Sequence, residues 1–305
     1  MESGPHLTIV ICTYNRAGYL SDTLSDIAAQ IADPNDFELI VVDNNSDDHT
    51  EEVCSRFRQT NPDIRFKYIQ EPKQGLSHAR NRAITESETA TLLFIDDDVK
   101  IPKNFVEKAL EYSSSRPNTL CAGGRIFVSF DEEESEPNWI PRELMPMFGL
   151  HDLGDEDQMY PSSNFPRGGN MMIRKSVFNA FGMFDTTLGR TGTTLLGGEE
   201  KAFFDRIRKN GLQMRYWAEL ELTHRIGSQR LNKAYFQKQS IGIGRSERLR
   251  VKGEPGKFLK KLLSELFKIG GSVILSILYL LRGRLRAAWF LQRFRFWVLR
   301  GFLQR

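Results

Sequence analysis

Short apolar runs alternate with amphipathic segments over the first hundred residues of the chain. Apolar-rich runs at residues 7–12, 37–42, 64–69 and 90–95 have the length of β-strands. Between them, apolar positions recur at helical spacing in residues 20–31 and 76–87. A further helix is expected between these two, ending near residue 59. Largely apolar strands that alternate with helices predict an α/β fold with a mainly parallel sheet, flanked by helices on both faces.

The later part of the chain is less regular. Residues 130–166 are acidic, rich in Pro, Met and aromatic residues, and predict a loop-rich segment. Structure is expected to resume at residues 167–174, followed by a short helix, 177–181, that Ser176 would cap. A helix over residues 199–210, ended by Gly211, and a strand over residues 212–217 complete this region.

Polar clusters follow three of the predicted strands. They consist of Thr13, Tyr14, Asn15 and Arg16, then of residues 43–48, and then of Asp96, Asp97 and Asp98. Ligands of parallel α/β sheets bind at the carboxyl ends of the strands. The three clusters therefore predict a ligand site at one edge of the sheet.

The three consecutive aspartates indicate a metal site. Adjacent carboxylates repel one another unless a cation or hydrogen-bond donors compensate, and Asp96 and Asp98 would point to the same side of an extended segment. Carboxylate oxygens suit Mg²⁺ or Mn²⁺, and His224, expected just beyond the strand 212–217, could add a nitrogen ligand. The alternative is a solvated acidic turn before a helix that Pro102 would begin.

Further side chains are candidates for binding a nucleotide. Asp43, directly after a predicted strand, could accept hydrogen bonds from a base or ribose, whereas residues 46–48 are better suited to capping the next helix. The cluster at Thr13 could stack on a nucleotide or simply pack a loop. Arg80 could face a pyrophosphate or form an ion pair.

Two carboxylates, Glu199 and Glu200, lie at the start of a predicted helix. The helix dipole favours negative charge there, so capping would explain one of them, while a glutamate near an acceptor hydroxyl could serve as a general base. Trp139 could stack on a sugar ring or anchor the packing of the loop-rich segment.

Taken in order, these segments resemble the family-2 inverting glycosyltransferases, which have the GT-A fold of nucleotide-diphospho-sugar transferases. The resemblance covers about residues 7–245 and rests on the order and spacing of seven motifs, at residues 10–16, 41–46, 75–82, 94–98, 168–170, 181–185 and 198–200. The family often has Gly-Glu-Asp where this chain has Gly198, Glu199 and Glu200. This difference keeps a carboxylate but leaves open which of the two glutamates is the base.

The resemblance implies a role for each site residue. Asp98 and Asp96, with His224, would hold Mg²⁺ or Mn²⁺, and Asp97 remains a rival ligand. The nucleotide sugar, by default a UDP-sugar, would contact Thr13, Tyr14, Asn15, Arg16, Asp43, Arg80, Asp96 and Asp97. Glu200 or Glu199 would deprotonate the acceptor, beside Trp139, Gly169 and Asn170. A single displacement with inversion would follow, as in a hexosyltransferase of polysaccharide biosynthesis.

Two other functions are weighed against this one. A nucleotidyltransferase acting on sugar phosphates would use similar aspartates but release pyrophosphate. A non-catalytic scaffold that only binds a nucleotide sugar would not need all four of the acidic residues Asp43, Asp96, Asp98 and Glu200. Processive members of the family carry several membrane spans and a Gln-x-x-Arg-Trp motif. Residues 229–233 read Gln-Arg-Leu-Asn-Lys instead, which favours transfer of a single sugar.

The charge of the chain is segregated. From Arg245 onward fifteen Lys and Arg residues stand against three Glu residues, a net +12, so residues 1–244 carry −9 within a total of +3. Residues 246–305 mix these cations with Leu, Phe and Trp, while the charge-free stretch 269–281 has only thirteen residues, fewer than the ~20 that span a bilayer. We therefore expect a catalytic domain over residues 1–245 and a basic helical tail that anchors on an anionic membrane surface.

The alternatives for the tail are packing on the catalytic domain or a homodimer contact, and its dense aromatic residues argue against a nucleic-acid partner. The three cysteines are widely spaced, and the start of the chain has no signal-peptide pattern. The sequence therefore predicts a cytoplasmic protein, peripheral on the inner face of the membrane.

Overall fold

A computed structural model of the chain describes residues 4–131, 139–192 and 197–304. The chain forms two compact units. The first comprises Met1–Val128, Gly149–Thr186 and Glu199–Arg225, and the second comprises Ser129–Phe148, Thr187–Gly198 and Ile226–Arg305. The predicted division at residue 245 lies within helix α7 (Lys233–Arg250), which belongs to the second unit.

The first unit is built on four parallel strands, each within two residues of its predicted position. They are β1 (Leu7–Thr13), β2 (Phe37–Asp43), β3 (Arg65–Gln70) and β4 (Thr91–Ile95). Every residue of β2 is buried, as expected for a strand with helices on both faces.

The other strands make the sheet mixed rather than mainly parallel. Among the described residues the order is β3-β2-β1-β4-β8-β6-β9-β5, with β7 paired to β9. β8 runs antiparallel to β4 and β6, and β9 runs antiparallel to β5 and β7. These strands are β5 (Val99–Lys100), β6 (Cys121–Phe130), β7 (Gln158–Met159), β8 (Asn170–Arg174) and β9 (Arg215–Ile226).

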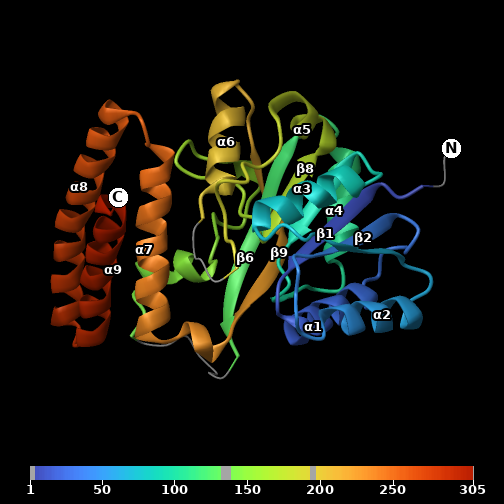
Figure 1. The fold of residues 1–305 in the computed structure, drawn as a ribbon, viewed down its shortest axis with the longest axis horizontal. Coiled ribbons are helices and arrows are strands. Elements are labelled where there is room, and N and C mark those ends of the chain that lie inside the picture. Colours follow the sequence, from blue (N-terminus) through green and yellow to red (C-terminus); the bar gives the residue numbers. More distant parts are fainter. Residues whose placement is uncertain (1–3, 132–138, 193–196, 305) are drawn as a thin grey trace. The chain divides into compact units, whose positions relative to one another are not determined.

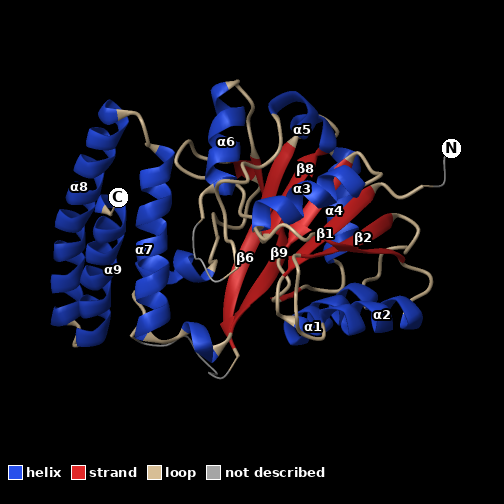
Figure 2. Ribbon diagram, in the orientation of Figure 1, coloured by secondary structure: helices blue, strands red, loops and turns tan. Residues whose placement is uncertain are grey.

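Helices cover both faces of this sheet (Figures 1 and 2). Ile9 and Ile11 of β1 pack toward the core of one face, and Val10 packs toward the core of the other, because successive strand residues point to opposite faces. The first face is covered by α1 (Ala17–Ala28), α2 (Thr50–Thr60) and α4 (Phe105–Ser115), and the second by α3 (Leu76–Glu86), α5 (Lys175–Phe181) and α6 (Glu199–Lys209).

Several predicted boundaries were wrong. Pro102 does not begin a helix, because α4 starts three residues later, at Phe105. The carbonyl of Pro102 accepts hydrogen bonds from Phe105 and Gln30. Ser176 is the second residue of α5 rather than its cap. Gly211 does follow α6 with a φ of +82°, the left-handed conformation that glycine adopts without strain.

Two short 3₁₀ helices occur among the described residues, and the first lies in the segment where loops were expected. They are η1 (Arg142–Phe148) and η2 (Ser228–Arg230). Residues 132–138 of the predicted loop-rich segment lie outside the described residues.

The second unit is mainly helical. Helix α9 (Leu285–Leu303) packs against both α7 and α8 (Pro255–Leu281). A Cβ atom on Gly244 of α7 would lie 2.0 Å from the carbonyl oxygen of Val298, and one on Gly301 of α9 would lie 2.2 Å from that of Ile241. These two glycines therefore allow the backbones of α7 and α9 to approach closely.

Helix α8 is longer than its charge-free stretch. It continues unbroken for 27 residues and, by length and composition, is apolar enough to cross a membrane. Counting only residues 269–281 underestimated it, because the helix also includes the Leu- and Lys-rich residues before Ile269.

Candidate active site

The parallel strands bring the polar clusters to the same edge of the sheet. Thr13 at the end of β1 is in register with Asp43 at the end of β2, and Ile11 is in register with Ile95 at the end of β4. The three aspartates that follow Ile95 therefore begin beside the last residues of β1.

Asp96, Asp98 and His224 form the group in this unit that suits a divalent cation. One ligand atom from each lies within 4.8 Å of the others, and His224 Nε2 is 3.1 Å from Oδ1 of Asp98. His224 lies inside β9, in register with Val99 of β5, and not beyond the strand as predicted. Two carboxylates and an imidazole are a donor set that Mn²⁺ or Mg²⁺ accepts.

Two residues expected to contact the nucleotide form hydrogen bonds with aspartates of the acidic cluster. Thr13 Oγ1 donates to Asp97 at 2.7 Å, and Arg16 donates to Asp97 at 2.7 Å and to Asp98 at 2.5 Å. Burial disfavours the charged guanidinium, but Asp97 and Asp98 outweigh that effect and raise the pKa of Arg16. Burial raises the pKa of Asp97 to about 6, although the charge of Arg16 opposes the shift.

The predicted base-reading residue, Asp43, is buried and hydrogen-bonded on both oxygens. Tyr68 donates its hydroxyl to Oδ2 at 2.7 Å, and the backbone N–H of Ser46 donates to Oδ1 at 2.9 Å. Burial and the hydrogen bond to Asp43 raise the pKa of Tyr68. The nucleotide contact of Asp43 stays a prediction, and Tyr68 is a partner that the sequence did not indicate.

Asn15 ties the loops after β1 and β2 together. Its side chain accepts from the N–H of Asp47 at 2.8 Å, and its own N–H donates to Ser46 Oγ at 2.9 Å. It adopts a φ of +54°, which asparagine tolerates better than most residues. Tyr14, next to it, is half-buried.

Arg80 joins the two candidate bases. Its Nη1 lies 3.0 Å from Glu199 and its Nη2 lies 3.1 Å from Glu200. Arg80 is only 3% exposed. Burial disfavours its charge, but the two glutamates outweigh burial and raise the pKa of Arg80.

Two adjacent glycines lie between the acidic cluster and this ion pair. A Cβ atom on Gly168 would lie 2.0 Å from both Arg80 Nη2 and Glu200 Oε1, and one on Gly169 would lie 2.7 Å from Oδ2 of Asp96. Asp96 and Glu200 therefore approach neighbouring residues of the same backbone segment. Because these two glycines have no side chain, Arg80, Glu200 and Asp96 can approach the backbone closely here.

Asn170, expected near an acceptor, is fully buried in the sheet. Its amide donates to the carbonyl of Arg125 at 3.1 Å and to that of Leu220 at 2.7 Å. It thereby joins β8 to the chains of β6 and β9. The structure thus places its side chain in the interior of the sheet.

Trp139, the other predicted acceptor contact, belongs to the second unit. Its ring centroid lies 4.6 Å from that of Phe290. Its role toward an acceptor stays a prediction.

Arg167 is a further cation that sequence reasoning did not select. Burial lowers its pKa, and the charge of Glu200 opposes that shift. The guanidinium carbon of Arg167 lies 4.3 Å from the centroid of the Phe165 ring. Its position beside Gly168 in a motif already singled out was the available signal.

Comparisons with known proteins agree with this architecture. Residues 8–182 match Glycosyl transferase family 2. A glucosyl-dolichyl phosphate glucuronosyltransferase of Haloferax volcanii is 22% identical over 246 residues, which cover 80% of this chain and 76% of that protein. A putative teichuronic acid biosynthesis glycosyltransferase, TuaG of Bacillus subtilis, is 30% identical over 127 residues, 42% of this chain and 49% of that protein.

Two solved structures share the fold. Mannosyltransferase PcManGT from Pyrobaculum calidifontis, in complex with GDP-Man and Mn²⁺, has a TM-score of 0.57 and 15% identity, covering 82% of this chain and 65% of that chain. S. aureus TarS 1–349, in complex with UDP-GlcNAc, has a TM-score of 0.51 and 16% identity, covering 78% and 66%. The chain thus spans just under two thirds of these two proteins and about half of TuaG.

The matches confirm the GT-A fold expected from the motifs, and the family match gives the reaction class as glycosyl transfer. Because the family match covers more than half of the chain and includes β1 to β4 with their aspartates, this protein belongs to glycosyl transferase family 2.

Proposed function

We propose that this glycosyltransferase moves one sugar from a nucleoside diphosphate sugar to an acceptor hydroxyl, with inversion and with the help of a divalent cation. The observation that carries the proposal is the arrangement around Gly168 and Gly169. Asp96 with its metal-suited partners approaches one glycine, and Glu200 approaches the other. A donor diphosphate and an acceptor hydroxyl need these two kinds of group on either side of one space.

Asp98, Asp96 and His224 would hold the cation. When bound there, Mn²⁺ or Mg²⁺ would supply positive charge to the departing diphosphate. Arg16 already occupies one oxygen of Asp98, so we expect it to share this carboxylate with the cation or to turn toward the diphosphate.

Glu200 is the preferred general base. Its side chain is 21% exposed, whereas that of Glu199 is 6% exposed, so Glu200 is the more accessible to an acceptor. Its carboxylate would take the proton of the acceptor hydroxyl while the hydroxyl oxygen attacks the anomeric carbon. The bond from that carbon to the diphosphate would break on the opposite face, and the nucleoside diphosphate would leave with its electron pair.

Relatives support the choice of substrates. The UDP-GlcNAc in the TarS structure and the GDP-Man in the PcManGT structure both fit a nucleoside diphosphate donor, and we favour a UDP-sugar. The Haloferax volcanii relative is named for a lipid-linked acceptor, glucosyl-dolichyl phosphate. We propose a lipid-linked or membrane-proximal glycan as the acceptor, met at the cytoplasmic face of a membrane.

A donor panel tests this proposal. The purified chain would be incubated with UDP-Glc, UDP-GlcA, UDP-GlcNAc and GDP-Man, each with Mn²⁺ or Mg²⁺, and the released nucleotide would be identified. We expect a nucleoside diphosphate from one donor and, by NMR of the product, an inverted anomeric configuration. Release of pyrophosphate would support a nucleotidyltransferase instead, and retained configuration would overturn the single displacement.

A further inference from the structure

Helix α8 exposes apolar residues and buries polar ones. Leu263, Phe267 and Ile274 are 57%, 84% and 64% exposed, and their spacing places them along one face of the helix. Glu265 and Ser272 are buried on the other side. A helix on the surface of a water-soluble domain shows the reverse pattern.

Hydrogen bonds to α9 fix this orientation of α8. Gln292 of α9 donates to Ser272 at 3.2 Å and to Ser276 at 2.8 Å. Glu265 pairs with Lys261 at 3.1 Å and with Lys268 at 2.8 Å. The Glu265 pairs lie within α8, but turning the apolar face inward would break both hydrogen bonds from Gln292.

Charge indicates what covers the outward face. Residues 255–304 contain ten Lys and Arg residues and a single acid, Glu265. A helix with an exposed apolar face and many cations binds at the interface of an anionic bilayer, to which Lys and Arg are attracted electrostatically.

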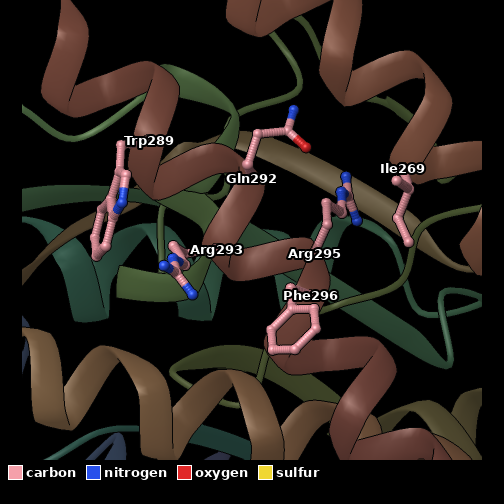
Figure 3. Close-up of a pocket in the computed structure, with 6 residues that line it drawn as sticks. All are labelled: Ile269, Trp289, Gln292, Arg293, Arg295 and Phe296. Carbon is pink, nitrogen blue, oxygen red and sulfur yellow. The ribbon is translucent and has the colours of Figure 1, made fainter.

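An open pocket of about 410 Å³ lies between α8 and α9 (Figure 3). Its walls are mostly apolar, but two guanidinium groups reach it, the Arg293 group on the side of Trp289 and the Arg295 group on the side of Ile269. Arg293 lies 5.2 Å from the ring of Trp289. The lining residues are Ile269, Trp289, Gln292, Arg293, Arg295 and Phe296.

Neither arginine has a carboxylate partner among the described residues. Nε of Arg295 is buried and, within that part of the chain, donates no hydrogen bond. Burial lowers the pKa of Arg295, and the nearby acid, Glu265, is already held by two lysines. Arg295 lies over the ring of Phe294 at 5.1 Å, but a half-buried guanidinium whose Nε has no hydrogen-bond acceptor is costly, and its planar fork matches a phosphate.

We infer that the outward face of α8 embeds in an anionic bilayer and that Arg293 and Arg295, on opposite sides of this pocket, bind phosphates of its phospholipids. A soluble phosphate would leave Ile269, Trp289 and Phe296 facing water, whereas a lipid covers them with its acyl chains. This inference does not depend on the catalytic assignment, because binding to vesicles requires neither donor nor acceptor.

Vesicle binding of the full chain tests the site. Co-sedimentation would be measured with vesicles of phosphatidylglycerol and phosphatidylcholine, and with phosphatidylcholine alone. The double variant Arg293→Gln/Arg295→Gln is compared with Arg282→Gln/Arg286→Gln, which removes two exposed arginines of the same hairpin that line no part of the pocket. We expect the first pair to weaken binding about tenfold more than the second, since it removes charge-assisted hydrogen bonds as well as charge.

Trp289 supplies a second readout that does not depend on charge. Phosphatidylglycerol brominated on its acyl chains should quench the fluorescence of the wild-type chain, and Trp289→Phe should remove most of that quenching while binding persists. Circular dichroism would verify that each variant keeps its helices.

Three results would overturn the inference. Equal weakening by both arginine pairs would mean diffuse electrostatic attraction rather than a phosphate site. Equal binding to pure phosphatidylcholine would remove the role of the anion. Displacement from vesicles by millimolar inorganic phosphate, without quenching by brominated lipid, would assign the pocket to a soluble anion.

Discussion

Nη2 of Arg80 lies 3.1 Å from Oε1 of Glu200. The proposed base is therefore held in position by a buried guanidinium, which also binds Glu199. The carboxylate of Glu200 is thereby held beside Gly168, where an acceptor hydroxyl could meet it. Several tests follow from this geometry.

Replacing the two glutamates one at a time separates the base from its neighbour. We expect Glu200→Gln to lower kcat by about 10²–10⁴-fold, the usual effect of removing a general base. Glu199→Gln should cost much less activity, because Glu199 is more deeply buried and would serve to hold Arg80. The measurement is steady-state release of nucleoside diphosphate, and the opposite ranking would transfer the role to Glu199.

The bridging role of Arg80 predicts a loss of stability as well as activity. Arg80→Gln leaves two carboxylates without their shared cation, and breaking a buried ion pair typically costs about 3 kcal/mol. Urea denaturation would measure the change. Arg82→Gln is the matched control on the same helix, because Arg82 forms a more exposed pair with Glu86 at 2.9 Å and should cost less than about 1 kcal/mol.

The glycine pair predicts a steric effect on catalysis. Gly168→Ala would bring a methyl group within 2.0 Å of Arg80 Nη2 and Glu200 Oε1, so both side chains must move. A displacement of about 1 Å in an active site can cost about 10²-fold in rate. Gly18→Ala, where no atom lies within 4 Å of the new Cβ, should leave kcat unchanged. Activity retained by Gly168→Ala would contradict the proposed site.

The group formed by Asp96, Asp98 and His224 predicts that transfer depends on a divalent cation. Chelation with EDTA should abolish transfer, and Mn²⁺ or Mg²⁺ should restore it. His224→Ala should raise the Mn²⁺ concentration needed for half-maximal activity about tenfold or more, since even residues that only support a ligand often contribute that much. His49→Ala, which removes an exposed histidine, is the control, and full activity in EDTA would rule out the cation.

Buried His151 predicts an acid-dependent loss of stability. Burial lowers its pKa from 6.5 to about 3, and its Nε2 is 2.8 Å from the hydroxyl of Tyr160. Since the folded state holds this histidine neutral, its contribution is present above pH 6.5 and is lost as the pH falls toward 3. Between pH 7 and pH 5 the loss should be about 2 kcal/mol.

Denaturation of wild type and His151→Gln at both pH values measures this contribution. The variant should be less stable at pH 7, yet its free energy of unfolding should change less between the two pH values. An identical change in both proteins would show that His151 is not the group responsible.

The sequence by itself determined the strands and polar clusters of the first hundred residues. The runs 7–12, 37–42 and 90–95 have the length and apolar character of buried strands, and parallel strands necessarily bring their carboxyl ends to one edge. That local pattern was sufficient to predict the α/β class and to expect Asp96 and Asp98 at the ligand edge.

Tertiary structure alone decided which distant residues meet. Arg80 and Glu200 are 120 positions apart, and His224 reaches Asp98 because β9 pairs antiparallel with β5 in one register. Strand β6 was missed because Cys121–Phe130 contains two adjacent glycines, which weaken the pattern of a strand. Pairing partners, register and the side of α8 that faces α9 depend on contacts between segments far apart in the chain, and no local pattern of residues encodes such contacts.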